Sequence, residues 1–208
     1  MRRVVGVVAG AAALLALPPA AKAQPGPIPW YERQDKGVEA QALAGLVVFP
    51  GAASDFLGTG LAYGVLVAIE PWSLVSFELS YQGALYQATS LASDADLSVF
   101  ENGGQAAVKL SPRLDHIEPY ALAGFGFASV EVVEEVGTRS RVQDDTLLQV
   151  PLALGADWHF ADEADEGAAH LTLGARASWI FVFDNELVPV SARGADKLLL
   201  ALVFGVQF

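Results

Sequence analysis

The sequence predicts an all-β fold, an eight-stranded antiparallel up-and-down transmembrane β-barrel, with a cleavable N-terminal signal peptide ahead of it. The chain has 208 residues, is 53% hydrophobic and lacks cysteine, and its mean hydropathy is +0.39. Beyond residue 23, however, no apolar run approaches the ~20 residues that a membrane-spanning helix needs. The apolar residues instead recur at every second position of short segments, which is the period of a β-strand. The composition excludes a disordered chain, and the missing cysteines exclude a disulfide scaffold.

The first residues have the organisation of a secretory signal peptide. Arg2 and Arg3 form a basic start, Val4–Leu17 is apolar, and Ala21-Lys22-Ala23 is a small-x-small cleavage motif. Since no cysteine follows this motif, a lipoprotein anchor is excluded. We therefore expect three parts: residues 1–23 as signal peptide, residues 24–37 as a periplasmic Pro-rich lead-in, and residues 38–208 as an outer-membrane β-barrel.

Cleavage changes the charge of the chain. Arg2, Arg3 and Lys22 leave with the signal peptide and no acidic residue does, so the formal net charge falls from −12 to −15. Nucleic-acid binding requires a basic face. The sequence therefore predicts an exported, acidic protein that does not bind nucleic acid.

Eight segments after Gly37 alternate between apolar and small or polar residues, and helical patterns are nearly absent. In the third segment, for example, Phe77, Leu79 and Tyr81 alternate with Glu78 and Ser80. We expect strands at Val38–Phe49, Thr59–Glu70, Ser73–Gln87, Gly103–Ser111, Glu118–Val133, Thr146–Phe160, His170–Asp184 and Leu198–Phe208. Pro151 interrupts the sixth segment, and because it cannot donate to a β-ladder we expect a bulge or a local gap there.

The two faces of these segments differ in kind. One face is bulky and apolar, and the other carries small residues with scattered polar and charged ones. A soluble lipocalin-like barrel would turn the bulky face inward around a ligand, whereas a membrane barrel turns it outward to lipid. The small face is too poor in charge to suit water, which favours the membrane barrel. The polar lumen cluster then comprises Glu39, Gln41, Glu78, Gln105, Lys109, Asp157 and Arg176.

This cluster contains both signs of charge. A charge inside a dry barrel must be paired. Glu39 and Glu78 can meet Lys109 and Arg176, so we expect ion pairs in a narrow lumen. Aromatic residues near the segment ends suggest two interfacial girdles. The expected girdle residues are Trp72, Tyr86, Trp158, Phe160, Trp179 and Phe181.

The connectors also alternate in length. Those after the second, fourth and sixth segments are short or compact: Pro71-Trp72, Pro112–Ile117 and Ala161–Ala169. Those after the third, fifth and seventh are longer and polar: Ala88–Asn102, Glu134–Asp145 and Asn185–Lys197. Short turns in the periplasm and long loops outside are typical of outer-membrane barrels. An even number of strands then places both ends of the barrel in the periplasm.

Two stretches resemble the small eight-stranded outer-membrane barrel family typified by the OmpA transmembrane domain and OmpX. Pro119-Tyr120-Ala121-Leu122-Ala123-Gly124-Phe125-Gly126-Phe127 is similar to the family's PYxxAGxG fifth strand. The C-terminal strand resembles the signal that the barrel assembly machinery reads in that family. The resemblance implies that this signal consists of Leu200, Leu202, Phe204, Val206 and Phe208.

The sequence shows no residue pattern that is typical of a catalytic or metal site. His116, His159 and His170 have no metal-ligand spacing, and we expect them to be solvated turn histidines near the periplasmic end. Asp162, Glu163, Asp165 and Glu166 lack the spacing of a Ca²⁺ loop, so we expect an acidic turn. We therefore expect no catalytic residues, no metal and no cofactor.

The sequence thus favours a non-enzymatic integral protein of the cell outer membrane, with a side-chain-filled lumen and a structural or surface-interaction role. Its partners would be outer-membrane lipid and lipopolysaccharide, and the barrel assembly machinery during biogenesis. Two alternatives stay open: a narrow, porin-like channel, and a soluble periplasmic lipocalin-like ligand-binding barrel.

Overall fold

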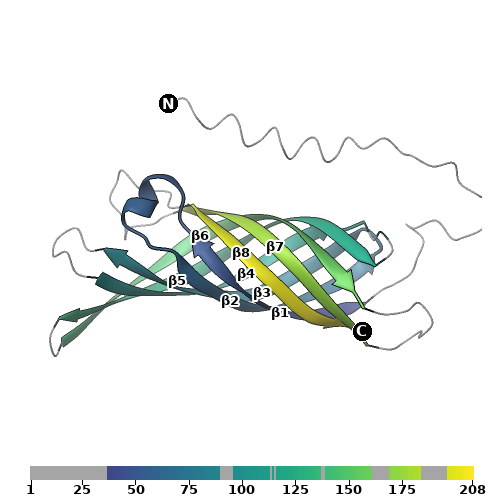
Figure 1. Cartoon of the computed structure of the whole chain (residues 1–208), viewed down its shortest axis with the longest axis horizontal. Coiled ribbons are helices and arrows are strands. Elements are labelled where there is room, and N and C mark those ends of the chain that lie inside the picture. The colour runs from purple at the N-terminus through teal and green to yellow at the C-terminus, as the bar shows by residue number, and fades with distance from the viewer. Residues whose placement is uncertain are drawn as a thin grey trace, which may run out of the picture.

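The computed structural model describes residues 37–89, 96–112, 114, 116–136, 139–160, 169–183 and 196–208. These residues form a closed barrel in which each strand pairs antiparallel with the next and the last strand pairs with the first (Figure 1). The predicted eight-stranded antiparallel barrel is therefore confirmed. The expected signal peptide and the lead-in up to residue 36 lie outside the described residues. Within the described ranges, no helix has the length and apolar character needed to cross a membrane.

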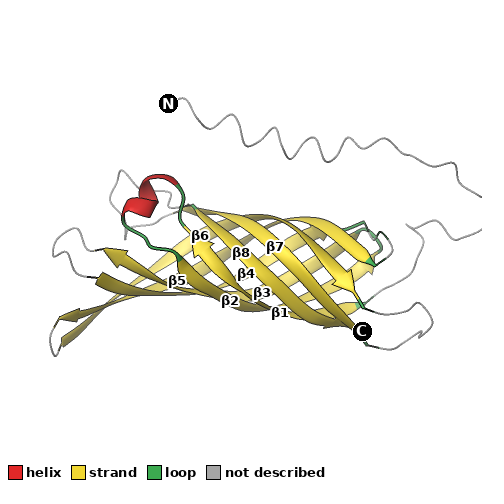
Figure 2. Cartoon of the chain, in the orientation of Figure 1, coloured by secondary structure: helices red, strands yellow, loops and turns green. Residues whose placement is uncertain are grey.

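The strands begin and end within three residues of the predicted segments, except that β4 and β6 begin seven residues earlier. They are β1 (Val38–Val48), β2 (Gly60–Trp72), β3 (Val75–Thr89), β4 (Asp96–Leu110), β5 (Ile117–Val136), β6 (Arg139–His159), β7 (His170–Phe183) and β8 (Lys197–Gln207). A short 3-10 helix, η1 (Gly51–Asp55), lies between β1 and β2 at the mouth opposite the C-terminus (Figure 2). We call the mouth that carries η1 the loop end, and the mouth with the β2–β3 turn and Phe208 the turn end.

The alternation of the sequence becomes an alternation between the outer surface and the lumen. On β8, Leu202 and Phe204 are 67% and 56% exposed, whereas Val203 between them is fully buried. Successive side chains of a strand point to opposite faces, so each strand contributes one outward and one inward row. The outward rows are bulky and apolar. This orientation is that of the membrane barrel and the reverse of the lipocalin-like alternative.

The register of the pairs shows how strongly the strands tilt. Starting from Thr146 on β6, successive partners lead through Ser129, Asn102, Gly83, Tyr63, Ala44, Leu202 and Ala175, and return to β6 at Ala156. One circuit therefore ends ten residues further along the same strand. A stagger of this kind closes the sheet with strands tilted by about 35–45° to the barrel axis, and eight strands leave an interior just wide enough for side chains.

Proline produces the two irregularities of the ladder. The β5–β6 pairs stop at Ala123↔Leu152 and resume in the same register at Gly126↔Gln149, leaving Pro151 inside the interruption. The expected local gap is thus present, without a change of register. Between β2 and β3 the register shifts between Ile69 and Trp72, on either side of Pro71.

Two connectors differ from the expected loops. Residues 134–145 were expected as a loop, but β5 and β6 stay paired as far as Val136↔Arg139, so most of this segment is a hairpin extending beyond the barrel (Figure 1). Likewise β4 begins at Asp96, seven residues before the expected Gly103, and pairs with β3 up to Thr89. The polar composition of these segments suggested loops, but antiparallel pairing needs no apolar face once the strands leave the bilayer, since water solvates both faces.

The lipid-facing row gives a direct test of the inside–outside assignment. Leu152 of β6 is 46% exposed on the outer surface. We expect Leu152→Arg to lower the free energy of unfolding in lipid by about 2–4 kcal/mol, because a cation near the bilayer midplane is strongly disfavoured. Urea unfolding of the barrel refolded into phospholipid vesicles measures this change.

Leu114→Arg is the matched control. Leu114 is also exposed but lies in the β4–β5 turn, so its replacement leaves the free energy of unfolding nearly unchanged. Equal losses in the two variants, or no loss at Leu152, would show that this outer row does not face hydrocarbon.

Candidate functional site

The lumen near the turn end holds a group of buried polar and ionic side chains on four strands, which we call the turn-end cluster: Glu39, Gln41, Lys109, Glu118, Asp157 and His159. Lys109 Nζ lies 3.7 Å from Glu39, 3.0 Å from Glu118 and 3.3 Å from Asp157. A single ammonium group therefore neutralises part of the charge of three carboxylates. In a water-poor lumen this pairing is what makes the burial of these charges tolerable.

Hydrogen bonds complete the cluster. Gln41 Nε2 donates to Glu39 Oε1 at 2.6 Å and lies 3.5 Å from Asp157 Oδ2. His159 Nε2 lies 3.1 Å from Glu118 Oε2. The expectation that His159 is a solvated turn histidine was wrong, because the last residue of β6 points into the lumen and is 8% exposed.

A bidentate ion pair lies next to this cluster. Arg176 of β7 donates to both carboxylate oxygens of Glu78 of β3, at 2.8 and 2.7 Å, across the interior of the barrel. Its Nε also donates to the Tyr120 hydroxyl at 3.0 Å. The Tyr120 ring lies 4.6 Å from Lys109 Nζ and 5.3 Å from Arg176 Cζ. Tyr120 thus joins the two cations and links the bidentate pair to the turn-end cluster.

A second polar group, the loop-end cluster, consists of Tyr86, Glu101, Gln105, Gln149 and Lys197. Glu101 is its centre: it forms an ion pair with Lys197, accepts from Gln149 Nε2 at 2.7 Å and accepts from the Tyr86 hydroxyl at 3.4 Å. Gln105 donates to Gln149 at 3.2 Å. A carboxylate held by these donors is well compensated despite its burial.

Apolar side chains fill much of the remaining lumen. One buried group comes from seven strands: Leu43, Ala62, Leu66, Val99, Val130, Leu147, Ile180, Val182, Leu199, Ala201 and Val203. A second group covers the loop end, where Phe49 and Ala53 of the β1–β2 connection pack with Val47 and Ala84. The Phe49 ring packs at a tilt against the Tyr86 ring, with the two ring centroids 4.7 Å apart. The segment carrying η1 therefore covers part of the loop-end mouth.

The space left inside is small. Between Glu101, Lys197, Gln149 and Ile180 the described part of the chain leaves a cavity of about 20 Å³. That is room for about one water molecule. At this level of the barrel the described side chains therefore form a packed core that contains ion pairs.

The seven side chains expected in the lumen all point inward. Glu39 lies near Lys109, and Glu78 pairs with Arg176, as the residue types suggested. Gln105, however, belongs to the loop-end cluster, apart from the other six.

The sequence did not lead us to predict that Glu101, Lys197 and Glu118 face the lumen. Glu101 and Lys197 lay inside expected loops, although the alternation of Val99, Glu101, Gly103 and Gln105 continues β4 without a break. Glu118 was read only as the start of a strand. Its inward position follows from the same parity as Tyr120, and this parity was the available signal.

Five of the six side chains expected in the aromatic girdles lie on the outer surface of the barrel. Trp72, Trp158 and Phe160 are exposed on the outer surface near the turn end. Trp179 and Phe181 form a tilted pair, 6.5 Å apart, on the outward row of β7. The prediction for Tyr86 was wrong. Even-numbered residues of β3 face the lumen, and there the Tyr86 hydroxyl donates a hydrogen bond to Glu101.

The described His, Asp and Glu side chains do not meet the requirements of a metal site. Among the described residues, no three His, Asp or Glu side chains are grouped so that they could hold a metal ion. The acidic turn Asp162–Glu166 lies outside the described residues. His116 stacks on Trp158 at 6.3 Å, at the turn end and outside the lumen clusters.

Removing either side chain of the Arg176–Glu78 pair leaves the other buried without its counter-charge. We expect Arg176→Met to lower the free energy of unfolding by about 3–5 kcal/mol, because Glu78 is left buried without its cation. The Arg176→Met/Glu78→Met double variant should recover much of this loss, since no unpaired charge remains. Urea unfolding in lipid vesicles supplies the double-mutant cycle, and additive losses would show that the two side chains do not interact.

No protein-family profile matches the sequence, and no curated protein has significant sequence similarity to it. Solved structures do share the fold. The N-terminal β-barrel domain of OprF from Pseudomonas aeruginosa aligns with a TM-score of 0.50 at 14% identity, over 83% of this chain and 98% of that one. Neisserial surface protein A aligns with a TM-score of 0.53 at 15% identity, over 84% of this chain and 98% of that one. The chain therefore has the fold of the small eight-stranded outer-membrane β-barrels.

Proposed function

We propose that this chain is a non-enzymatic integral protein of the cell outer membrane, with a closed lumen and a structural or surface-interaction role. The observation that carries the proposal is the combination of an apolar outer surface with an interior filled by paired charges. An apolar band facing outward is stable only in lipid. A lumen without an aqueous passage leaves the connections at the loop end as the surface available to partners.

The ionic side chains of the lumen support a structural role over a catalytic one. Five of them are at most 4% exposed, and each forms an ion pair with another member of the set: Glu39, Glu78, Lys109, Asp157 and Arg176. A general acid or base must reach the substrate within hydrogen-bond distance. These groups are held away from solvent, so they serve to pack the barrel.

The partners follow from the location. Outer-membrane lipid and lipopolysaccharide contact the outer surface, and the barrel assembly machinery inserts the chain. The net charge of −15 expected for residues 24–208 repels nucleic acid. Residues 1–23 serve as the export signal and residues 24–37 as a lead-in on the periplasmic side.

The conductance of the pure protein separates this proposal from the channel alternative. Because the lumen is packed, we expect no discrete current steps after insertion into a planar bilayer in 1 M salt. An open porin in the same bilayer is the positive control. Reproducible steps from heat-modifiable protein would contradict the closed lumen and favour a narrow channel.

The orientation can be tested because the native chain has no cysteine. Ala52 lies in the η1 connection and Ala169 precedes β7 at the turn end, and both are exposed. We expect Ala52→Cys to react with a membrane-impermeant maleimide on intact cells, and Ala169→Cys only after the outer membrane is opened. The reverse pattern would invert the barrel, and labelling of neither before opening would place the chain elsewhere.

The C-terminal strand should act in assembly. Leu200, Leu202, Phe204 and Phe208 are exposed on the outer face of β8. We expect Phe208→Asp to reduce the heat-modifiable barrel in outer membranes several-fold, while refolding in detergent stays efficient because the substitution keeps the two backbone hydrogen bonds between Phe208 and Val38. Val38→Asp at the same seam is the control for a general effect of charge. Normal amounts of barrel in the Phe208 variant would remove its role as a signal.

A further inference from the structure

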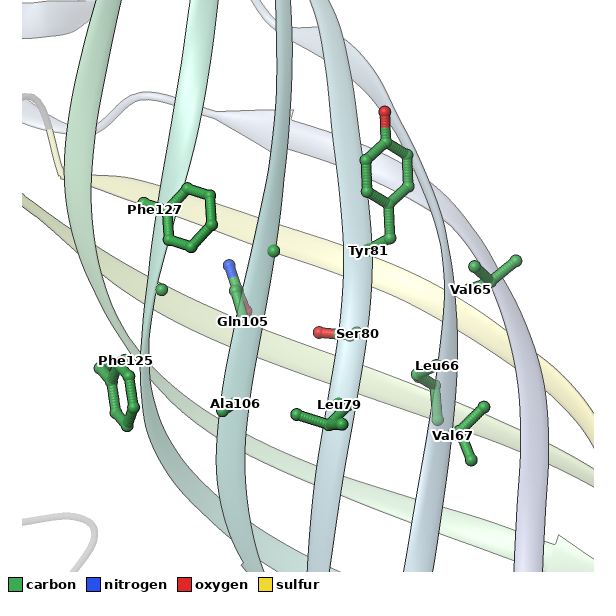
Figure 3. A pocket seen from close by; sticks show the side chains of 12 residues that line it. Val65, Leu66, Val67, Leu79, Ser80, Tyr81, Gln105, Ala106, Phe125 and Phe127 are labelled. Atoms are coloured by element: carbon green, nitrogen blue, oxygen red, sulfur yellow. The ribbon is translucent and has the colours of Figure 1, made fainter.

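A groove lies on the outer surface of the barrel above β4 (Figure 3). Leu79 and Tyr81 of β3, together with Val65 and Val67 of β2, form one wall, and Phe125 and Phe127 of β5 form the other. Ala106 and Gly104 of β4 lie between the walls. The groove has a volume of about 430 Å³, and its walls are strongly exposed, with Leu79, Phe125 and Phe127 each about two-thirds accessible.

Gly104 keeps this groove open. A Cβ atom at residue 104 would have no neighbour closer than 4.0 Å, the distance to the Phe127 ring and to the Ser80 carbonyl. The situation differs at Gly83, Gly103 and Gly124, where a Cβ would lie within 3 Å of other atoms. Neither crowding nor backbone conformation requires glycine at position 104. Its effect is to leave a hollow between the large apolar side chains of β3 and β5.

A polar triad borders the groove on the side of the loop end. The Tyr63 and Tyr81 hydroxyls both donate to Asn102 Oδ1, at 2.7 and 3.0 Å. Asn102 is two residues from Gly104 on the same outward row of β4, and Tyr81 belongs to both the triad and the groove wall. The triad thus presents hydroxyl oxygens as acceptors and the Asn102 amide as a donor beside an apolar hollow.

We propose that this groove binds an acyl chain of lipid A from the outer leaflet, with the triad hydrogen-bonding to the polar linkage of that chain. This inference rests on the proposed function, because it needs the loop end to face outward. In hydrocarbon, lipids and protein associate through packing and hydrogen bonds, since apolar burial gives no net gain there. A hollow of this size with a hydrogen-bonding rim provides both for one lipid chain.

The chemistry of the triad favours lipid A over a phospholipid. The acyl chains of lipid A carry amide and hydroxyl groups close to their attachment points, and these groups both donate and accept hydrogen bonds. Phospholipid chains offer ester carbonyl oxygens, which only accept. The triad supplies acceptors as well as a donor, which matches the first set.

The test measures lipid binding to the refolded, detergent-solubilised chain by native mass spectrometry, with purified hexa-acyl lipid A as the probe. We expect one lipid A per barrel. A Cβ at position 104 has open space around it, so Gly104→Leu should place its side chain in the groove and weaken binding about tenfold by displacing the acyl chain. Tyr63→Phe and Tyr81→Phe remove the hydroxyls and should weaken it several-fold.

Ala175→Leu is the matched control, because Ala175 is also a small, exposed, outward residue but lies on β7. It should bind lipid A like the unaltered protein. Phosphatidylethanolamine at the same concentration should bind about tenfold more weakly than lipid A. Heat-modifiability confirms that each variant is a folded barrel before it is compared.

Three results would overturn the inference. Equal lipid A binding by the unaltered protein and Gly104→Leu would remove the groove as the site. Equal binding of phosphatidylethanolamine would remove the preference for lipid A. Dimers that disappear in Gly104→Leu would make a second copy of the chain the occupant.

Fractionation of cells that express the chain tests the proposed function independently of lipid binding. A chain found outside the outer membrane refutes the proposed function. A chain found in the outer membrane that shows no selective lipid A binding refutes only this inference.

Discussion

The pairing of β1 with β8 is the constraint on which the rest of the structure depends. A sheet exposed to hydrocarbon cannot leave the N–H and C=O groups of an edge strand without partners, so it must close. The ladder from Glu39↔Gln207 to Val48↔Leu198 performs that closure. With eight strands and a stagger of ten residues, closure leaves a narrow interior that side chains must fill.

The contents of the lumen follow from this narrow interior. Each charge brought inside must find a counter-charge and hydrogen-bond donors, because little water remains to solvate it. Arg176 meets Glu78 in bidentate geometry, Lys109 is surrounded by three carboxylates, and Glu101 is held by Lys197 and Gln149. The apolar outer surface and the polar, filled interior are therefore two consequences of one closed ladder. At Gly104 the outward row carries no side chain, and the large side chains of the neighbouring strands enclose a groove there.

Sequence reasoning captured the features that depend on a period of two. Strand number, facing rows and the presence of Glu39, Glu78, Lys109 and Arg176 in one lumen follow from parity and from the need to pair charges. It missed features that depend on three-dimensional register. Glu101 and Lys197 are 96 residues apart and meet only because their strands stand across the same lumen. Tyr86 was assigned to the surface on its residue type, although its parity on β3 places it inside. The groove above Gly104 depends on rings from neighbouring strands, which no single segment reveals.

A cysteine pair across the seam between β1 and β8 tests the closed barrel most directly. Ala44 and Leu202 are direct partners with side chains on the outer surface, and the chain has no native cysteine. Antiparallel partners lie about 4.5–5.5 Å apart at Cα, within the range of a disulfide. The account predicts that Ala44→Cys/Leu202→Cys forms an intramolecular disulfide in outer membranes, whereas Ala44→Cys/Leu198→Cys, whose positions are out of register, does not. Absence of the first cross-link, or cross-links between two chains, would contradict the closure of the barrel.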